Sequence, residues 1–163
     1  MSLFEGYLST PEAVAAFSGQ AVVAAMLRFE AALAQAQADE GLVPLAVARS
    51  IVDTCRVELF DVEKIVRDSG RAGSVAIPLI RALREAVGLF NADAVAWTHF
   101  GSSSQDVIDT ALVLVTRDAL ALLDADLQRC VQALLALAEA HADTPMLART
   151  LMQPASVTSL GFK

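Results

Sequence analysis

The stretch Gln105–Thr144, QDVIDTALVLVTRDALALLDADLQRCVQALLALAEAHADT, decides the fold because it contains neither glycine nor proline. Nothing in it therefore interrupts a helix. Apolar residues recur along it at three- and four-residue steps with one gap, which places them on one helix face. They are Val113, Leu120, Leu123, Leu127, Cys130, Leu134 and Leu137. A helix of roughly 35 residues would be about 50 Å long, so it needs partners along its length and predicts a long helical bundle.

Shorter helices are expected before this stretch. Thr10 and Pro11 begin one, with capping-box spacing between Ser9 and Glu12, and Ser18-Gly19 interrupts it. A longer helix then runs to Glu40. Its expected apolar face is Val22, Met26, Phe29, Leu33 and Ala36.

Further helices are expected from Pro44, from Asp61 to Gly70 and from Pro78 to Gly88, with a loop at 71–74. No segment alternates with period two long enough to predict a strand. The class is therefore all-α. We expect a helical N-terminal domain over residues 1–104, and the start of a central bundle over 105–163. Because residues 156–163 open what looks like a new helix, we expect the chain to be a fragment of a longer polypeptide.

Composition excludes several classes of function. Hydrophobic residues make up 55% of the chain, the formal charge is −7, and lysine and arginine form no cluster. Nucleic-acid binding needs such clusters, so no nucleic-acid partner is expected. The uncharged stretch Ala13–Leu27 is broken by Ser18, Gly19 and Gln20, so we expect no membrane span.

The two cysteines, Cys55 and Cys130, do not have the spacing of metal ligands. Both fall in helical patterns, and we expect buried, reduced thiols. The first five residues lack the basic region and apolar run of a signal peptide. Together these features predict a cytoplasmic protein without a bound metal.

The segment Trp97–Thr110, WTHFGSSSQDVIDT, is the sharpest indication of chemistry. Ser103 and Asp106 have the spacing of a helix cap. The same geometry suits an anion, because free backbone N–H groups and hydroxyls meet where the helix dipole favours negative charge. His99 lies just before this turn, where it could donate to a carboxylate or move a proton, although a lone histidine is more often structural. His141, at the end of the long helix, is expected to be structural.

A second polar segment is Met146–Ala155, MLARTLMQPA. Arg149, Thr150 and Gln153 lie close together in what we expect to be a loop before a new helix. These side chains could jointly bind a carboxylate and a carbonyl. The alternative is a solvated loop in which Arg149 forms a structural ion pair.

These segments, in this order, resemble the fumarase/aspartase superfamily of lyases and cycloisomerases. Its members carry His-x-Gly-x-Thr-Ser-x-Asp-x-x-Asp-Thr, which matches the segment from His99 to Thr110 with Ser103 in place of threonine. They also carry a Gly-Arg-Thr element, matched by Arg149 and Thr150 with Ala148 in place of glycine. The segment Met26–Gln37, followed by Gly-Leu-Val-Pro, is most similar to the carboxymuconate cycloisomerases.

The resemblance implies a homotetramer in which active sites form where three subunits meet. The substrate would be a small dicarboxylate or tricarboxylate, and no cofactor or metal would be needed. His99 would be the catalytic residue of this chain, orienting or polarising the substrate. The residues implied to bind the substrate are Ser103, Ser104, Gln105, Arg149, Thr150 and Gln153.

Three departures bear on the substrate. The loop Gly-Ser-Ser-x-Met-Pro-x-Lys-x-Asn, which supplies the superfamily's catalytic serine, is absent. Leu151 stands where adenylosuccinate lyases have a catalytic histidine, and Pro154 where the cycloisomerases usually have one. We expect a cycloisomerase that lactonises 3-carboxy-cis,cis-muconate. The alternatives are another lyase, releasing fumarate or a related acid, and a catalytically incomplete helical assembly fragment.

Overall fold

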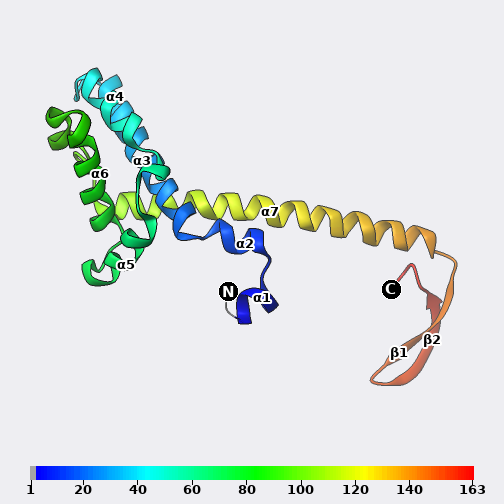
Figure 1. Cartoon of the computed structure of the whole chain (residues 1–163). Coiled ribbons are helices and arrows are strands. Elements are labelled where there is room, and N and C mark those ends of the chain that lie inside the picture. Colours follow the sequence, from blue (N-terminus) through cyan, green and yellow to red (C-terminus); the bar gives the residue numbers. More distant parts are fainter. Residues whose placement is uncertain (1–2) are drawn as a thin grey trace. The chain divides into compact units, whose positions relative to one another are not determined.

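The computed structural model describes residues 3–163, with side chains from residue 5 onward, and it is predominantly helical (Figure 1). The expected all-α class is confirmed. The helices are α1 (Leu3–Leu8), α2 (Pro11–Ala16), α3 (Gly19–Asp39), α4 (Leu45–Thr54), α5 (Val62–Ala72), α6 (Ala76–Phe90) and α7 (Ser104–Ala140), with 3-10 helices η1 (Val57–Leu59) and η2 (Ala92–Trp97). Strands β1 (Pro145–Thr150) and β2 (Gln153–Ser159) follow. The chain divides into two compact units, residues 1–119 and 120–163.

Side-chain caps set most of the helix starts. Thr10 Oγ1 accepts from the Ala13 N–H at 3.3 Å, so Thr10 rather than Ser9 begins α2. Ser18 Oγ accepts from the Ala21 N–H at 3.2 Å and separates α2 from α3. Asp61 caps α5, which ends at Gly73 in the left-handed conformation at φ 70°. The helix thus continues through two residues that we had expected in a loop.

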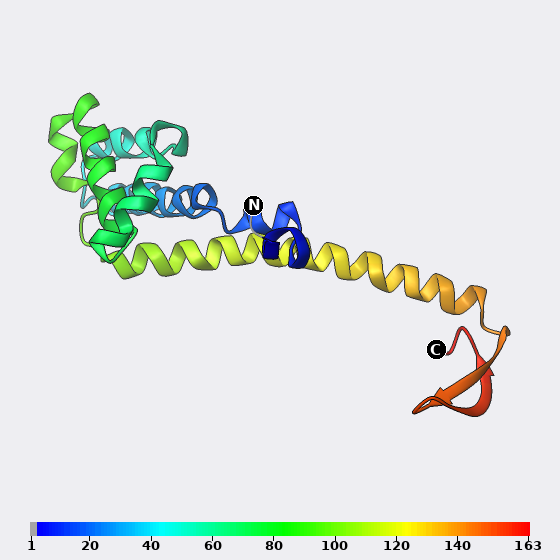
Figure 2. The same ribbon diagram turned by 60° about the horizontal axis from the view of Figure 1, so that its bottom comes forward.

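The core of the first unit lies between α3, α4 and α6, which pack against their neighbours in both views (Figures 1 and 2). The buried face of α3 is displaced from the expected one. Val23, Met26, Leu27, Glu30 and Ala34 are buried, and only Met26 belongs to both sets. The difference arises because α4 packs on one side of α3 and α5 and η1 also contact it, which periodicity alone does not reveal.

Length and mean hydropathy alone would allow the stretch Pro11–Asp39 to cross a membrane. Core helices often meet the same two criteria. Here the stretch is broken at Phe17–Ser18, and Val23, Met26 and Leu27 are 0–1% exposed within the unit. These three side chains belong to the core of the first unit.

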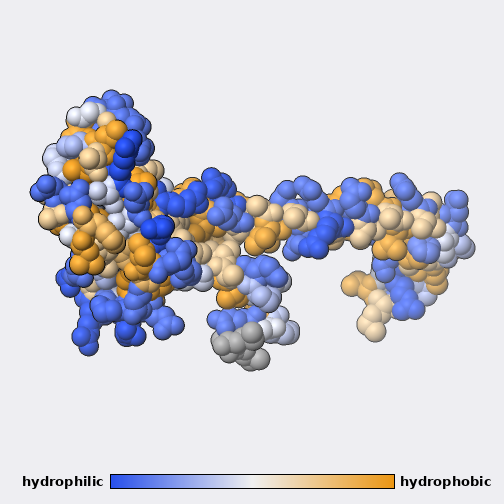
Figure 3. Space-filling model, turned by 45° about the horizontal axis from the view of Figure 1, so that its top comes forward, coloured by the Kyte–Doolittle hydropathy of each residue, from blue (hydrophilic) through white to orange (hydrophobic). Residues whose placement is uncertain are grey.

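Helix α7 contributes to both units. Val107, Ala111 and Val115 are 0–3% exposed and join the core of the first unit, so the boundary between units falls inside the helix. Farther along, the expected apolar stripe is uncovered in the described residues. Leu127 is 65% exposed and Leu134 60%. Figure 3 shows hydrophobic surface along this part of the helix. Cys130 is exposed there too, so the expectation that it is buried is wrong for this chain.

Residues 145–159 form an antiparallel hairpin, where we had expected a loop and a new helix. Leu151 and Met152 form its two-residue turn with φ of 45° and 68°, the positive values that a type I′ turn requires. Asn-Gly normally marks such a turn, so the sequence carried no hairpin signal. Beyond β2 the chain returns to the end of α7, where the Gly161 N–H donates to the His141 carbonyl at 2.8 Å.

Candidate active site

The turn before α7 places His99 against a carboxylate from α3. His99 Nδ1 lies 2.7 Å from Glu30 Oε1, and the two side chains are 12% and 1% exposed. His99 has a positive φ of 61°, and Gly101, two residues on, has 70°. Sequence reasoning missed Glu30. The signal that could have found it is an acidic residue at helical spacing from Leu27 and Ala34, among otherwise apolar positions.

The second oxygen of Glu30, Oε2, is buried without a hydrogen-bond partner among the described residues. Burial raises the pKa of the Glu30 carboxyl above its usual 4.5, while His99 and Arg84 act in the opposite direction. A buried carboxylate with one unpaired oxygen costs stability. Its presence beside His99 therefore requires a reason other than packing.

This raised pKa makes the free energy of unfolding depend on pH. Below about 4.5 the carboxyl is protonated in both states; above that, the folded state retains its proton longer than the unfolded state. The contribution of Glu30 to stability should therefore be complete at low pH and fall as pH rises through the raised pKa. Urea unfolding at a series of pH values, followed by the fluorescence of Trp97, should show this fall in the wild type. Glu30→Gln should lack it, while the exposed control Glu85→Gln should retain it; equal slopes in all three would contradict this assignment.

Cys55, which follows α4, lies partly buried near the same carboxylate. Burial, and then the negative charge of Glu30, raise the pKa of its thiol from 9.0 to about 12. The thiolate is the nucleophile, so its fraction at a given pH is lowered by about 1000-fold. We expect a disulfide reagent at mildly alkaline pH to modify the exposed Cys130 rapidly and Cys55 much more slowly. Peptide mass spectrometry of timed samples measures both, and similar rates in the folded chain would refute the prediction.

A reciprocal cap closes the first turn of α7. The Ser103 N–H and hydroxyl donate to Asp106 Oδ2, each at 2.8 Å, and Ser103 Oγ accepts from the Asp106 N–H at 3.2 Å. The Ser103 N–H first and then its hydroxyl lower the pKa of Asp106, with smaller effects of Ser102 and His99. The predicted cap is present, and it occupies the Ser103 hydroxyl that we had assigned to substrate.

Other donors at this helix start remain free. The backbone N–H groups of Ser104 and Gln105 and the Ser104 hydroxyl make no hydrogen bond within the described part of the chain. The Gln105 side chain is engaged, donating to Asp109 at 2.6 Å. Free N–H groups at a helix N-terminus suit an anion. A carboxylate would therefore meet Ser104 and the backbone of Gln105 rather than Ser103.

The second predicted group lies on the hairpin of the other unit. Thr150 pairs with Gln153 across the turn, and Arg149 pairs with Pro154. A bulge follows, where Ala155 and Ser156 lie opposite the single residue Ala148. Arg149 lines a hollow of about 740 Å³ together with Lys163, Ser156 and Thr158. Both charged residues of this hollow are basic, so it suits a carboxylate, although Thr150 and Gln153 do not line it.

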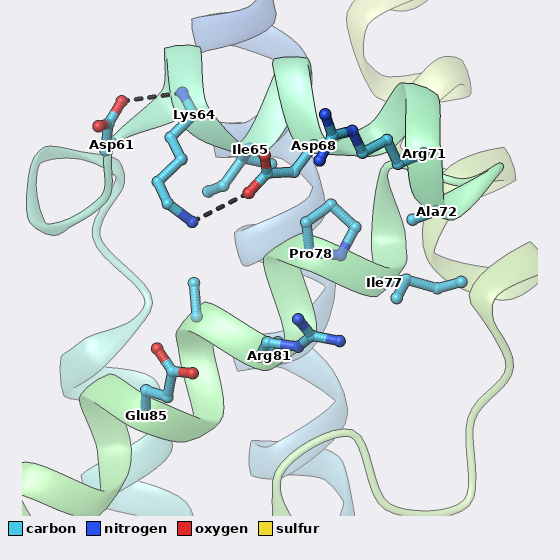
Figure 4. A pocket seen from close by; sticks show the side chains of 11 residues that line it. Asp61, Lys64, Ile65, Asp68, Arg71, Ala72, Ile77, Pro78, Arg81 and Glu85 are labelled. Atoms are coloured by element: carbon cyan, nitrogen blue, oxygen red, sulfur yellow. Dashed lines mark hydrogen bonds and ion pairs between the residues drawn. The ribbon is translucent and has the colours of Figure 1, made fainter.

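A separate groove of about 560 Å³ lies between α5 and α6 (Figure 4). Its charges balance, since three acidic and three basic side chains line it, and Lys64 is bound to Asp68 at 2.9 Å. The six charged residues are Asp61, Lys64, Asp68, Arg71, Arg81 and Glu85. It contains none of the residues expected to bind substrate, and its balanced charge gives a polyanion no advantage.

A family model described as "Lyase" matches residues 7–163. This chain therefore belongs to that lyase family, part of the fumarase/aspartase superfamily, as its two polar segments had indicated.

Within the superfamily, the chain is similar to 3-carboxy-cis,cis-muconate cycloisomerases. It is 44% identical to the one from Pseudomonas aeruginosa over 161 residues, which is 99% of this chain and 35% of the relative. The solved lactonizing enzyme of Pseudomonas putida superposes with a TM-score of 0.92 at 40% identity, over 98% of this chain and 36% of that one. A nitrosuccinate lyase of Streptomyces davaonensis is 42% identical over 91% of this chain and 31% of its own length. The chain thus spans about a third of the length of the curated relatives it matches.

Proposed function

We propose that this chain is part of a cycloisomerase that lactonises 3-carboxy-cis,cis-muconate in the degradation of protocatechuate. The observation that carries the proposal is the 44% identity to a cycloisomerase across nearly the whole chain. In this reaction a carboxylate oxygen forms a bond to one carbon of a double bond, and the neighbouring carbon takes up a proton. No atom is lost or oxidised, so the protein has to bind carboxylates, orient the diene and move one proton.

The site residues can be given roles on this basis. Ser104 and the backbone of Gln105 would bind one substrate carboxylate at the start of α7. Arg149, which lines the basic hollow with Lys163, would bind another carboxylate through its guanidinium. Thr150 and Gln153, which pair with each other beside the turn, would bind the substrate at a separate place on the hairpin. His99 would orient or polarise the substrate through its ring. Ser103 would act indirectly, since its hydroxyl holds the cap.

We further propose that the protein assembles as a cytoplasmic homotetramer with shared active sites, in which residues 105–163 begin the central bundle. The uncovered apolar residues of α7 support this, because each such side chain gains about 1.5–3 kcal/mol when it is buried.

The test is turnover by the protein expressed from the full reading frame. Added 3-carboxy-cis,cis-muconate should lose its diene absorbance and yield the lactone by mass spectrometry. The 163-residue chain alone should be inactive, because the superfamily's serine loop is not among its residues. No turnover by a folded, assembled protein would refute the proposal.

A second candidate is a lyase that releases an unsaturated acid, as the similarity to the nitrosuccinate lyase suggests. A coupled fumarate assay on succinyl-type compounds, run on the same preparation, separates this activity from lactone formation. Absence of both activities would favour a helical assembly fragment.

A further inference from the structure

The three residues that precede Gly101 are each held by a different long polar side chain. Arg84 Nε and Nη2 donate to the Thr98 carbonyl at 3.3 and 3.2 Å, and Gln37 Nε2 donates to the Phe100 carbonyl at 2.7 Å. Between them, Glu30 Oε1 meets the His99 ring nitrogen Nδ1 at 2.7 Å. Glu30 and Gln37 are both on α3, about two turns apart, and so share one face.

Only one of these three contacts holds a side chain. Arg84 and Gln37 bind backbone carbonyls and so fix the path of the turn, including the positive φ of 61° at His99. A residue other than glycine in that conformation costs of order 1 kcal/mol or more, which these anchors must offset. Glu30 instead fixes the imidazole ring itself.

The burial of Glu30 is difficult to explain by stability. The side chain is 1% exposed, and its Oε2 has no partner among the described residues. An apolar residue of similar size would avoid this desolvation cost. The hydrogen bond to His99 is therefore the effect of this carboxylate that best explains its presence.

We propose that Glu30 is the positioning residue for His99: its carboxylate accepts a hydrogen bond from Nδ1–H, and so leaves Nε2 as the nitrogen that faces the substrate. Nε2 makes no hydrogen bond within residues 3–163, and it is not among the atoms buried without a partner. When the His99 ring is neutral and carries its proton on Nδ1, Nε2 accepts a hydrogen bond. When the ring is doubly protonated, Nε2 donates one, so Nε2 can contact the substrate in either state. The substrate that Nε2 would face rests on the proposed function. The hydrogen bond between Glu30 and His99 does not depend on it.

The tautomer of His99 is measurable without any substrate. The chain has two histidines, and His141 is an internal control, because its Nδ1 lies 3.2 Å from the Thr144 hydroxyl and it contacts no carboxylate among the described residues. Long-range 1H–15N correlation spectra of the 163-residue chain, taken where the rings are neutral, should show His99 protonated at Nδ1 and bare at Nε2. His141 should favour the commoner Nε2–H form. In Glu30→Met, His99 should lose its preference for Nδ1–H. A His99 that is protonated at Nε2 in the wild type would overturn the proposal.

Kinetics supply the second measurement, in the protein from the full reading frame. Glu30→Gln should lower kcat by about 10- to 100-fold, the range seen when partners of metal-bound histidines are removed. KM should change less, and the pH profile of kcat should shift. Gln37→Met, which removes a backbone anchor from the same face of α3, is the matched control and should leave the pH profile in place. Unchanged kcat and pH profile in a folded Glu30→Gln variant would refute the role. If the wild type does not act on carboxymuconate, the proposed function fails, and the tautomer spectra alone decide whether Glu30 positions His99.

Discussion

Glutamate in place of both Leu127 and Leu134 is expected to dissociate the protein expressed from the full reading frame and to lower its kcat/KM by at least about 100-fold. These two side chains are 65% and 60% exposed in the chain by itself. If α7 packs in a bundle, each substitution removes a buried leucine and puts a carboxylate in its place, at a cost of several kcal/mol per site. Because the proposed active sites are shared between subunits, activity should be lost together with assembly.

Sedimentation velocity and lactone formation measure the two effects. The matched control is Gln128→Glu with Gln132→Glu, which adds the same two charges at neighbouring exposed polar positions of α7. The control should sediment like the wild type. A doubly substituted leucine variant that kept the wild-type sedimentation coefficient would show that this face of α7 is not an assembly surface.

Leu83→Ala is expected to lower the free energy of unfolding of the first unit by about 2–5 kcal/mol, the range for a fully buried leucine. Leu83 is 0% exposed and belongs to the cluster formed by α3, α4, α6 and the start of α7. A domain of this size has a total stability of about 5–15 kcal/mol, so the loss is a large part of it.

Leu89→Ala makes the same chemical change on the same helix, where the side chain is 83% exposed, and should cost less than about 0.5 kcal/mol. Urea unfolding followed by Trp97, the only tryptophan of the chain, reports on this unit. Equal losses in the two variants would contradict the packing described for α6.

Helix signals were the most informative part of the sequence. The absence of glycine and proline from Gln105 to Thr144 predicted α7, which runs from Ser104 to Ala140. Ser103 and Asp106 form the predicted cap. These features depend on contacts between residues three or four positions apart, so the spacing of residues in the sequence predicts them directly.

The hairpin and the buried face of α3 were not predictable in the same way. The turn at Leu151 and Met152 uses two positive φ values without the residues that usually adopt them, and the pairing of β1 with β2 on either side of it stabilises it. The face of α3 depends on which helices surround it. That choice depends on residues that are distant in the sequence.

The sequence by itself determined the all-α class, the long helix and its serine cap, and it indicated the family. Each of these follows from the spacing of nearby residues or from a short motif. Only the tertiary structure paired His99 with Glu30, two residues 69 positions apart that no periodicity connects. It also showed that the cap uses the Ser103 hydroxyl, while the Ser104 hydroxyl and the first N–H groups of α7 make no hydrogen bond among the described residues. The physical reason is that a side chain's chemistry depends on its partners in space, and a buried carboxylate gains a role only from the group it meets.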